Sequence, residues 1–89
     1  MSYKFTFSIS CERQIDKASR KNPILRKAIT NKINEIIVDP SRFKPLAYDL
    51  AGECRVHILR CFVLKFAIDE KAKLVVFVFF GHHDDAYRR

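Results

Sequence analysis

Several features that define other protein classes are scarce or missing in this chain. Among 89 residues there are only 2 glycines, 3 prolines and no tryptophan, which excludes collagen-like, linker-like and low-complexity chains. The longest strongly apolar run, Leu74 to Phe80, is far shorter than the roughly 20 residues that span a bilayer. The N-terminus, MSYKFTFSIS, lacks the basic and apolar regions of a signal peptide. We therefore expect a cytoplasmic protein that does not cross a membrane.

The sequence also lacks the motifs of several enzyme classes. Its cysteines, Cys11, Cys54 and Cys61, are odd in number and contain no C-x-x-C pair, which argues against a disulfide framework and a zinc site. We expect ordinary buried thiols instead. Glycine-rich phosphate loops, the dinucleotide-binding fingerprint and the G-x-S-x-G motif are absent, so nucleotide-dependent enzymes and serine hydrolases are excluded. We expect no cofactor.

Positive charge is abundant. Seventeen Lys and Arg against ten Asp and Glu give a net charge of +7, and 48% of the residues are hydrophobic. The hydrophobic content predicts a folded chain, and the length predicts one domain covering residues 1–89. The charge favours a nucleic acid, an anionic membrane or an acidic protein as the partner, and charge alone does not separate them.

The first half of the chain predicts one strand and two helices. Apolar and polar residues alternate from Tyr3 to Ile9, which is the pattern of a half-buried strand. A short helix follows, with Ser8 or Ser10 as its N-cap. The Asn-Pro pair at 22–23 starts a second helix with apolar residues at helical spacing, which ends before the Asp-Pro pair at 39–40.

The second half predicts a loop over 41–52 and three strands over 54–58, 62–68 and 74–80. The last strand is apolar on both faces and is therefore expected at the centre of the sheet. The order is β-α-α-β-β-β. This predicts an α+β fold in which two antiparallel helices cover one face of a small, mainly antiparallel four-stranded sheet.

Basic side chains are expected on the uncovered face of that sheet. Arg55 and His57 share the polar side of one strand, Lys65 lies on the next, and Arg60 is at the bend between them. Cross-strand neighbours lie about 5 Å apart, within reach of one phosphodiester group. A solvated sheet face is the alternative interpretation. Three phenylalanines could stack on bases if exposed, namely Phe43, Phe77 and Phe79, although such residues are more often part of the core.

The chain ends in HHDDAYRR, which holds two imidazoles, two carboxylates and a phenol. A metal site is disfavoured, because His82 and His83 point to opposite faces of an extended backbone. A solvated polar tail is again the alternative. Together with the basic face, His82 or His83 and Tyr87 would combine fixed cations with groups that move protons. Metal-free RNA cleavage needs these parts, since the ribose 2'-OH already lies beside the phosphorus.

The layout resembles the RelE/ParE superfamily of toxins. The resemblance is carried by the β-α-α-β-β-β order, the LAG at 50–52, the strands CRVHI and FVLKFAID and the ending HHDDAY, and it spans nearly the whole chain. It implies the corresponding fold. RelE-like members are ribosome-dependent endoribonucleases that cut mRNA in the A site and are neutralised by an antitoxin, whereas ParE-like members inhibit DNA gyrase.

The resemblance assigns roles to individual residues. Arg55 and His57 stand where RelE-like toxins place two basic residues on the second strand. Tyr87 corresponds to the family's tyrosine near the C-terminus, His83 to the basic or histidine position four residues before it, and His82 to a histidine of several relatives. The histidines favour a RelE-like over a ParE-like member.

One departure from the family pattern concerns the third strand. Val63 occupies a position where the family has an arginine. Lys65, two residues further and facing the same way, or Arg60 at the bend could supply the missing charge. If neither does, catalysis would be weakened.

The sequence and the resemblance together predict a type II toxin that acts as a metal-free endoribonuclease on ribosome-bound mRNA. Arg55 and Lys65 would bind the phosphate, Tyr87 or a histidine would accept the 2'-OH proton, and His83 or His57 would protonate the leaving oxygen. The assignment of acid and base stays open. The expected partners are mRNA, the ribosome and an acidic antitoxin in a heteromeric complex, with no membrane. The alternatives are a gyrase inhibitor and a toxin-fold protein that only binds its antitoxin.

Overall fold

The computed structural model describes residues 2–43 and 53–82. In chain order the elements are β1 (Lys4–Phe7), α1 (Ile9–Ser19), α2 (Pro23–Val38), the 3-10 helix η1 (Pro40–Phe43), β2 (Cys54–Ile58), β3 (Phe62–Asp69) and β4 (Leu74–His82). The predicted β-α-α-β-β-β order is confirmed. Each predicted helix and strand is present, with boundaries shifted by a few residues at most.

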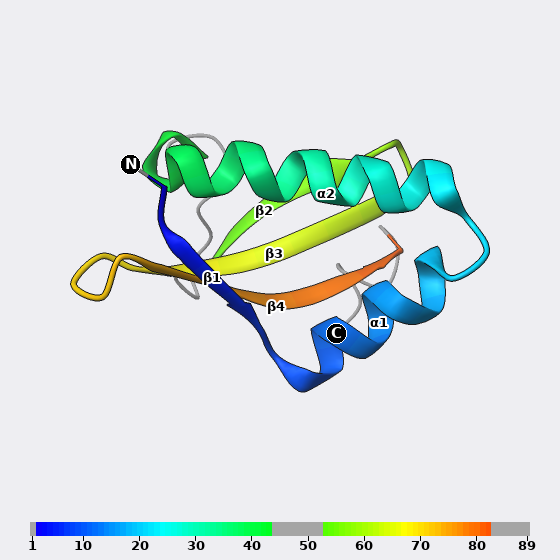
Figure 1. The fold of residues 1–89 in the computed structure, drawn as a ribbon, viewed down its shortest axis with the longest axis horizontal. Helices are drawn as coiled ribbons and strands as arrows, with labels where there is room; N and C mark the ends of the chain where they lie inside the picture. Colours follow the sequence, from blue (N-terminus) through cyan, green and yellow to red (C-terminus); the bar gives the residue numbers. More distant parts are fainter. Residues whose placement is uncertain (1, 44–52, 83–89) are drawn as a thin grey trace.

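The four strands form one sheet in the order β1-β4-β3-β2 (Figure 1). Strand β1 runs parallel to β4, whereas β2 with β3 and β3 with β4 are antiparallel. The strand that is apolar on both faces, β4, lies between β1 and β3, as its composition predicted. The α+β architecture with a mainly antiparallel sheet is therefore confirmed.

Side-chain caps start both helices. Of the two candidate serines, Ser8 is the N-cap of α1, and its hydroxyl accepts a hydrogen bond from the Cys11 amide at 3.1 Å. Asn22 caps α2 by accepting from the Leu25 amide at 3.1 Å. The prediction that Ile9 belongs to the first strand is wrong. Because Ser8 already caps the helix, Ile9 is its first residue, and its side chain is 76% exposed.

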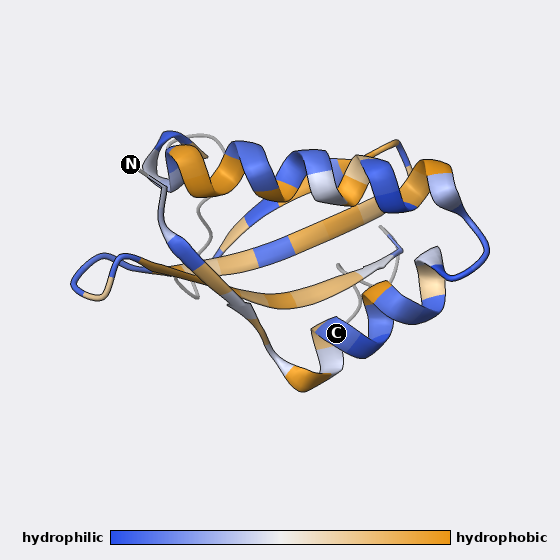
Figure 2. Ribbon diagram, viewed as in Figure 1, coloured by the Kyte–Doolittle hydropathy of each residue, from blue (hydrophilic) through white to orange (hydrophobic). Residues whose placement is uncertain are grey.

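Both helices cover the same face of the sheet, which we call the covered face. Apolar residues of α1 and α2 pack there on alternate residues of the strands. Figure 2 shows that orange and blue segments alternate along α2, while β3 and β4 are mostly orange. The fully or nearly fully buried members of this core are Cys11, Leu25, Ile29, Ile33, Ile36, Cys54, Val56, Ile58, Leu64, Phe66, Val75, Phe77 and Phe80. No helix of the described ranges is both long and apolar enough to span a membrane.

Two of the three cysteines are buried in this core, as expected, but Cys61 is exposed. It lies in the turn between β2 and β3, where the chain reverses beyond the end of the strand pairing. Leu59 in the same turn has φ 57°, a left-handed conformation that tight reversals often need. The number and spacing of the cysteines do not predict that Cys61 is exposed, because its exposure follows from its position in the turn.

Helix α1 is tied to the end of β4 by hydrogen bonds. Strand β1 ends opposite Phe77, so the backbone of β4 beyond that point needs other partners. Ser8 supplies two of them, since its amide donates to the Phe77 carbonyl at 2.9 Å and its hydroxyl to the Val78 carbonyl at 3.3 Å. The Phe80 amide donates to Gln14 Oε1 at 3.0 Å. These bonds hold α1 against the covered face.

Candidate nucleic-acid interface

The face of the sheet opposite the two helices, which we call the open face, carries two rows of side chains across β2, β3 and β4. In the first row Arg55 pairs with Lys65, which pairs with Phe79. In the second row His57 pairs with Val63, which pairs with Gly81. Strand alternation places these side chains away from the core, because the intervening residues of β2 and β3 pack on the helices. The predicted basic residues of β2 and β3 therefore share one face.

Arg55 and Lys65 are direct cross-strand partners, both half-buried. Side chains in such a pair start about 5 Å apart, which lets both reach one phosphate group. Two cations held opposite each other favour an anion between them. Lys65 Nζ also lies 5.4 Å from the centre of the Phe79 ring, a cation–π contact. The first row thus joins two cations and one aromatic ring.

The second row adds an imidazole. His57 is exposed and lies two residues from Arg55 on the same side of β2. Its partner Val63 has no exposed surface, although it alternates onto the open face. Val63 therefore offers neither charge nor accessible surface to a phosphate, and Lys65 is the cation of β3 that points the same way.

The remaining predicted site residues are placed differently. Arg60 is exposed in the turn between β2 and β3. His82 lies on the covered side of β4, where its ring meets that of Phe62 edge to face at 5.9 Å and borders a shallow hollow with Lys17 of α1. The structure thus separates His82 from Arg55, His57 and Lys65. His83 and Tyr87 lie outside the described residues.

Of the three phenylalanines that could stack on a base if exposed, Phe77 is in the core and Phe43 packs against it, whereas Phe79 is not part of the core cluster. The ring is half-buried on the open face. A register shift between Lys65 and Phe66 causes the difference, because Lys65 pairs with Phe79 while Phe66 pairs with Phe77. The extra residue in β4, Val78, changes which residues alternate onto each face. No local sequence signal marks such a bulge.

Within residues 2–43 and 53–82, the titratable and metal-binding side chains form no further candidate catalytic or metal site. In these ranges no three His, Cys, Asp or Glu side chains lie close enough together to hold a metal ion. Burial raises the pKa of the Cys11 thiol to about 12, so this thiol stays protonated and unreactive at neutral pH. Cys11 is a core residue.

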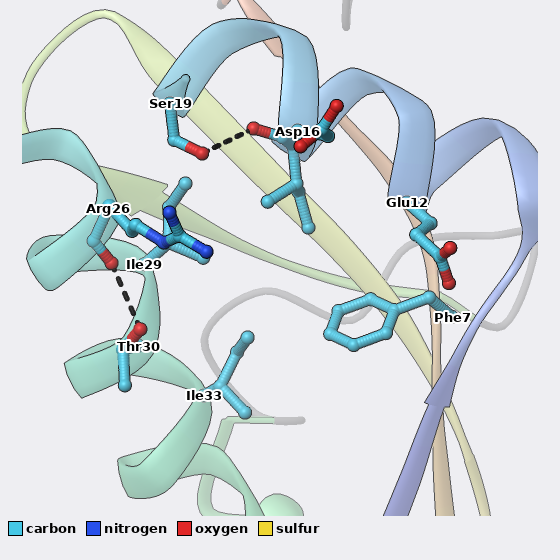
Figure 3. A pocket seen from close by; sticks show the side chains of 9 residues that line it. Phe7, Glu12, Asp16, Ser19, Arg26, Ile29, Thr30 and Ile33 are labelled. Atoms are coloured by element: carbon cyan, nitrogen blue, oxygen red, sulfur yellow. Dashed lines mark hydrogen bonds between the residues drawn. The ribbon is translucent and has the colours of Figure 1, made fainter. Parts of the chain in front are cut away.

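A cleft of about 250 Å³ lies between the two helices on the covered face (Figure 3). Phe7 of β1 lies at its base, and side chains of α1 and α2 converge on it, including Asp16 and Arg26. None of the site residues predicted from the sequence lines it. The cleft is therefore separate from the first row of Arg55, Lys65 and Phe79, which is on the other side of the sheet.

Comparisons with known proteins place the chain among relatives. No family model matches it. It is 38% identical over 87 residues to "Putative toxin RelE4" of Methanocaldococcus jannaschii, covering 98% of this chain and 93% of that protein. It is 36% identical over 76 residues to an uncharacterized protein of Methanosarcina mazei, covering 85% of this chain and 88% of the other.

Two solved structures share the fold. The toxin-antitoxin complex RelBE2 of Mycobacterium tuberculosis contains a chain that matches with a TM-score of 0.72 at 24% identity, over 93% of this chain and 100% of that one. A conserved hypothetical protein of Helicobacter pylori, determined in solution, matches with a TM-score of 0.64 at 17% identity, over 92% and 96% of the two chains. At these identities the likeness concerns the fold.

Proposed function

We propose that this chain, which belongs to the RelE family of toxins of toxin-antitoxin systems, is an endoribonuclease that cuts mRNA on the ribosome. The observation that carries the proposal is the Arg55–Lys65 pair on the open face, with His57 beside it on β2. This arrangement offers two cations for one phosphodiester and an imidazole within the same surface. The proposed site of action is the cytoplasm, where mRNA is translated.

The proposed reaction needs no metal. The ribose 2'-oxygen attacks the adjacent phosphorus and the bond from phosphorus to the 5'-oxygen breaks, which leaves a 2',3'-cyclic phosphate and a 5'-hydroxyl. The enzyme must take the 2'-OH proton, stabilise the negative charge that builds on the phosphate and return a proton to the 5'-oxygen. Arg55 and Lys65 would stabilise that charge as fixed donors.

Proton transfer is proposed for His57 and for the predicted tail residues His83 and Tyr87. The two ring nitrogens of an imidazole can donate or accept a proton, so His57 suits either role. Tyr87 or a histidine would accept the 2'-OH proton, and His83 or His57 would protonate the leaving oxygen. His82 faces α1 rather than the open face, and we assign it no step.

Lys65 is proposed to replace the arginine that the family has at position 63. Val63 is fully buried, whereas Lys65 lies on the same face directly opposite Arg55. A lysine supplies a point charge to the phosphate but not the two-pronged hydrogen bonding of an arginine. The substitution therefore keeps the charge and lowers the geometric precision of phosphate binding.

An acidic antitoxin is the proposed protein partner. The net charge of +7 favours an acidic surface. The RelBE2 chain that shares this fold was solved as part of a toxin-antitoxin complex. A partner that binds the folded toxin would also stabilise it, which matters for a chain with so small a core.

The test is single-turnover cleavage of ribosome-bound mRNA. Arg55→Ala and Lys65→Ala should each slow cleavage by about 100- to 1000-fold, because each removes a donor to the charged phosphate. His57→Ala, His83→Ala and Tyr87→Phe should lower the rate by about 100- to 10,000-fold wherever the group transfers a proton. Lys71→Ala removes an exposed cation from the turn between β3 and β4 and should leave the rate within about twofold.

Undiminished cleavage by both Arg55→Ala and Lys65→Ala would contradict the assignment of the phosphate site. Growth arrest with intact mRNA and an induced DNA-damage response would instead indicate a gyrase inhibitor. A chain that leaves growth unaffected would be a protein that only binds its antitoxin.

A further inference from the structure

Phe79 differs from every other phenylalanine in its surroundings. The other seven all take part in ring–ring contacts on or near the covered face, for example Phe62 with Phe80 at 5.4 Å and Phe7 with Phe77 at 5.2 Å. Among the described residues, Phe79 has no aromatic neighbour at such a distance. Its ring lies 5.4 Å from the ammonium group of Lys65 and close to Gly81, where an added Cβ would meet it. Its position is therefore not explained by packing of the core.

The residue at position 81 determines where the Phe79 ring can lie. A Cβ atom added to Gly81 would meet Phe79 Cζ at 2.8 Å, closer than real Cβ contacts. The ring thus lies along the sheet surface over Gly81, in space that any other residue would occupy. Since residues 79 and 81 share one face of β4, the glycine leaves the space on the open face that the end of the ring occupies.

We propose that Phe79 is a platform on which one base of the RNA substrate stacks, beside the phosphate held by Arg55 and Lys65. This proposal rests on the proposed nuclease function and adds a base-binding residue to it. Adjacent strands are about 4.8 Å apart, so the row from Arg55 through Lys65 to Phe79 spans about 10 Å, which is the scale of one nucleotide from phosphate to base.

The chemistry of the row suits a single-stranded substrate. Every base has a flat π-face, so an aromatic platform binds bases with little dependence on their identity. Lys65 lies between the two halves of this arrangement, since it pairs with Arg55 and its ammonium lies 5.4 Å from the Phe79 ring. Because this ammonium lies over the ring, a stacking base would displace it toward the phosphate, and the flexible lysine stem allows that movement. The cations would hold the backbone and Phe79 would orient the base.

The absence of tryptophan from the chain allows a direct test by fluorescence. Phe79→Trp introduces a single tryptophan on the platform. It would be titrated with a short single-stranded RNA made of 2'-O-methyl nucleotides, which cannot be cleaved, and with the same oligonucleotide carrying abasic sites. Stacking predicts quenching by the first, with an affinity about 5- to 150-fold higher than for the abasic oligonucleotide.

Phe5→Trp is the matched control, because Phe5 is 45% exposed and contacts Phe7 and Phe77 of the covered face. Its fluorescence should not respond to either oligonucleotide. Three results would each refute stacking on Phe79. They are equal quenching of Phe79→Trp by both oligonucleotides, the same response from Phe5→Trp, and no quenching by either oligonucleotide at saturating concentration.

Gly81→Ala tests the position of the ring without removing it. The Cβ would push against the far end of a side chain rather than against backbone, so the ring shifts and the fold persists. RNA affinity should fall by about 5- to 150-fold, as for Phe79→Ala, whereas Phe79→Tyr should bind like wild type. Unchanged affinity in both Gly81→Ala and Phe79→Ala would refute the proposal.

The two levels of the hypothesis fail differently. If quenching depends on the bases but the protein never cuts mRNA, the stacking role of Phe79 is supported and the nuclease function is refuted. If Phe79→Ala cleaves ribosome-bound mRNA at the normal rate, and an abasic site in the mRNA causes no further loss, the nuclease function is supported and the stacking role of Phe79 is refuted.

Discussion

The two faces of the sheet use the same strands for different purposes. On the covered face, rings and aliphatic side chains from β2, β3 and β4 pack against α1 and α2 and are almost completely buried. On the open face, Arg55 and Lys65 pair across strands and Phe79 lies beside them. The difference shows how a small sheet separates two kinds of surface: the covered face holds the fold together, and the open face carries the cationic side chains of β2 and β3.

Strand β4 makes the comparison sharpest, because its neighbouring phenylalanines belong to different faces. Phe77 and Phe80 have no exposed surface and contact rings of β1 and β3. Phe79 lies between them in sequence and on the opposite side of the sheet. The bulge between the two paired segments produces this arrangement.

The largest expected difference is between two substitutions in β4. Phe77→Ala should lower the free energy of unfolding by about 3 to 5 kcal/mol, because it removes a fully buried ring and leaves a cavity. Phe79→Ala should lower it by less than about 1 kcal/mol, since that ring lies on the open face. Urea unfolding of both variants measures the difference. Similar losses for the two would mean that both faces contribute equally to stability.

A smaller effect is expected at the bond that ties α1 to the end of β4. Gln14→Ala leaves the part-buried Phe80 amide without its acceptor and should cost about 1 to 3 kcal/mol. Gln14→Glu keeps an acceptor oxygen and serves as the control. Hydrogen exchange at the Phe80 amide should speed up in the alanine variant alone. Unaltered exchange would show that another group satisfies this amide.

The smallest effect at neutral pH concerns the thiols. Exposed Cys61 should react with a thiol reagent in the native protein, while Cys11 and Cys54 should react only after denaturation.

Burial raises the pKa of Cys11 from 9.0 to about 12, so between these values the unfolded chain loses a proton that the folded chain keeps. Stability should therefore fall as the pH rises above about 9.

Cys11→Ala isolates this contribution, because it removes the titrating group while other residues still ionise at alkaline pH. Urea midpoints measured at pH 8 and pH 10 should decline less for the variant than for wild type. An equal decline would assign the pH dependence to other groups.

Local patterns were enough to predict most of the fold. The Asn-Pro pair at 22–23 predicted the start of α2, and alternation predicted β2 and β3. These features depend on neighbouring residues, through a cap, a restricted φ angle or a two-residue period, so they can be recognised without knowing the tertiary structure. The expectation that Arg55, His57 and Lys65 share a face has the same origin.

Features that depend on pairing between distant segments could not be predicted in this way. Strict alternation would put Phe79 on the face of Phe77, and only the register of β4 against β3 places it opposite. The burial of Val63 and the position of His82 beside α1 likewise follow from what packs around them.

The sequence by itself determined the elements, their order and which residues of β2 carry charge outward, because these depend on interactions within a few residues along the chain. The tertiary structure alone decided that the Phe79 ring lies beside Lys65 on the open face and that His82 lies on the covered face. Those outcomes depend on a single bulged residue and on the docking of a helix, where segments more than 60 residues apart in sequence meet, as Gln14 meets Phe80.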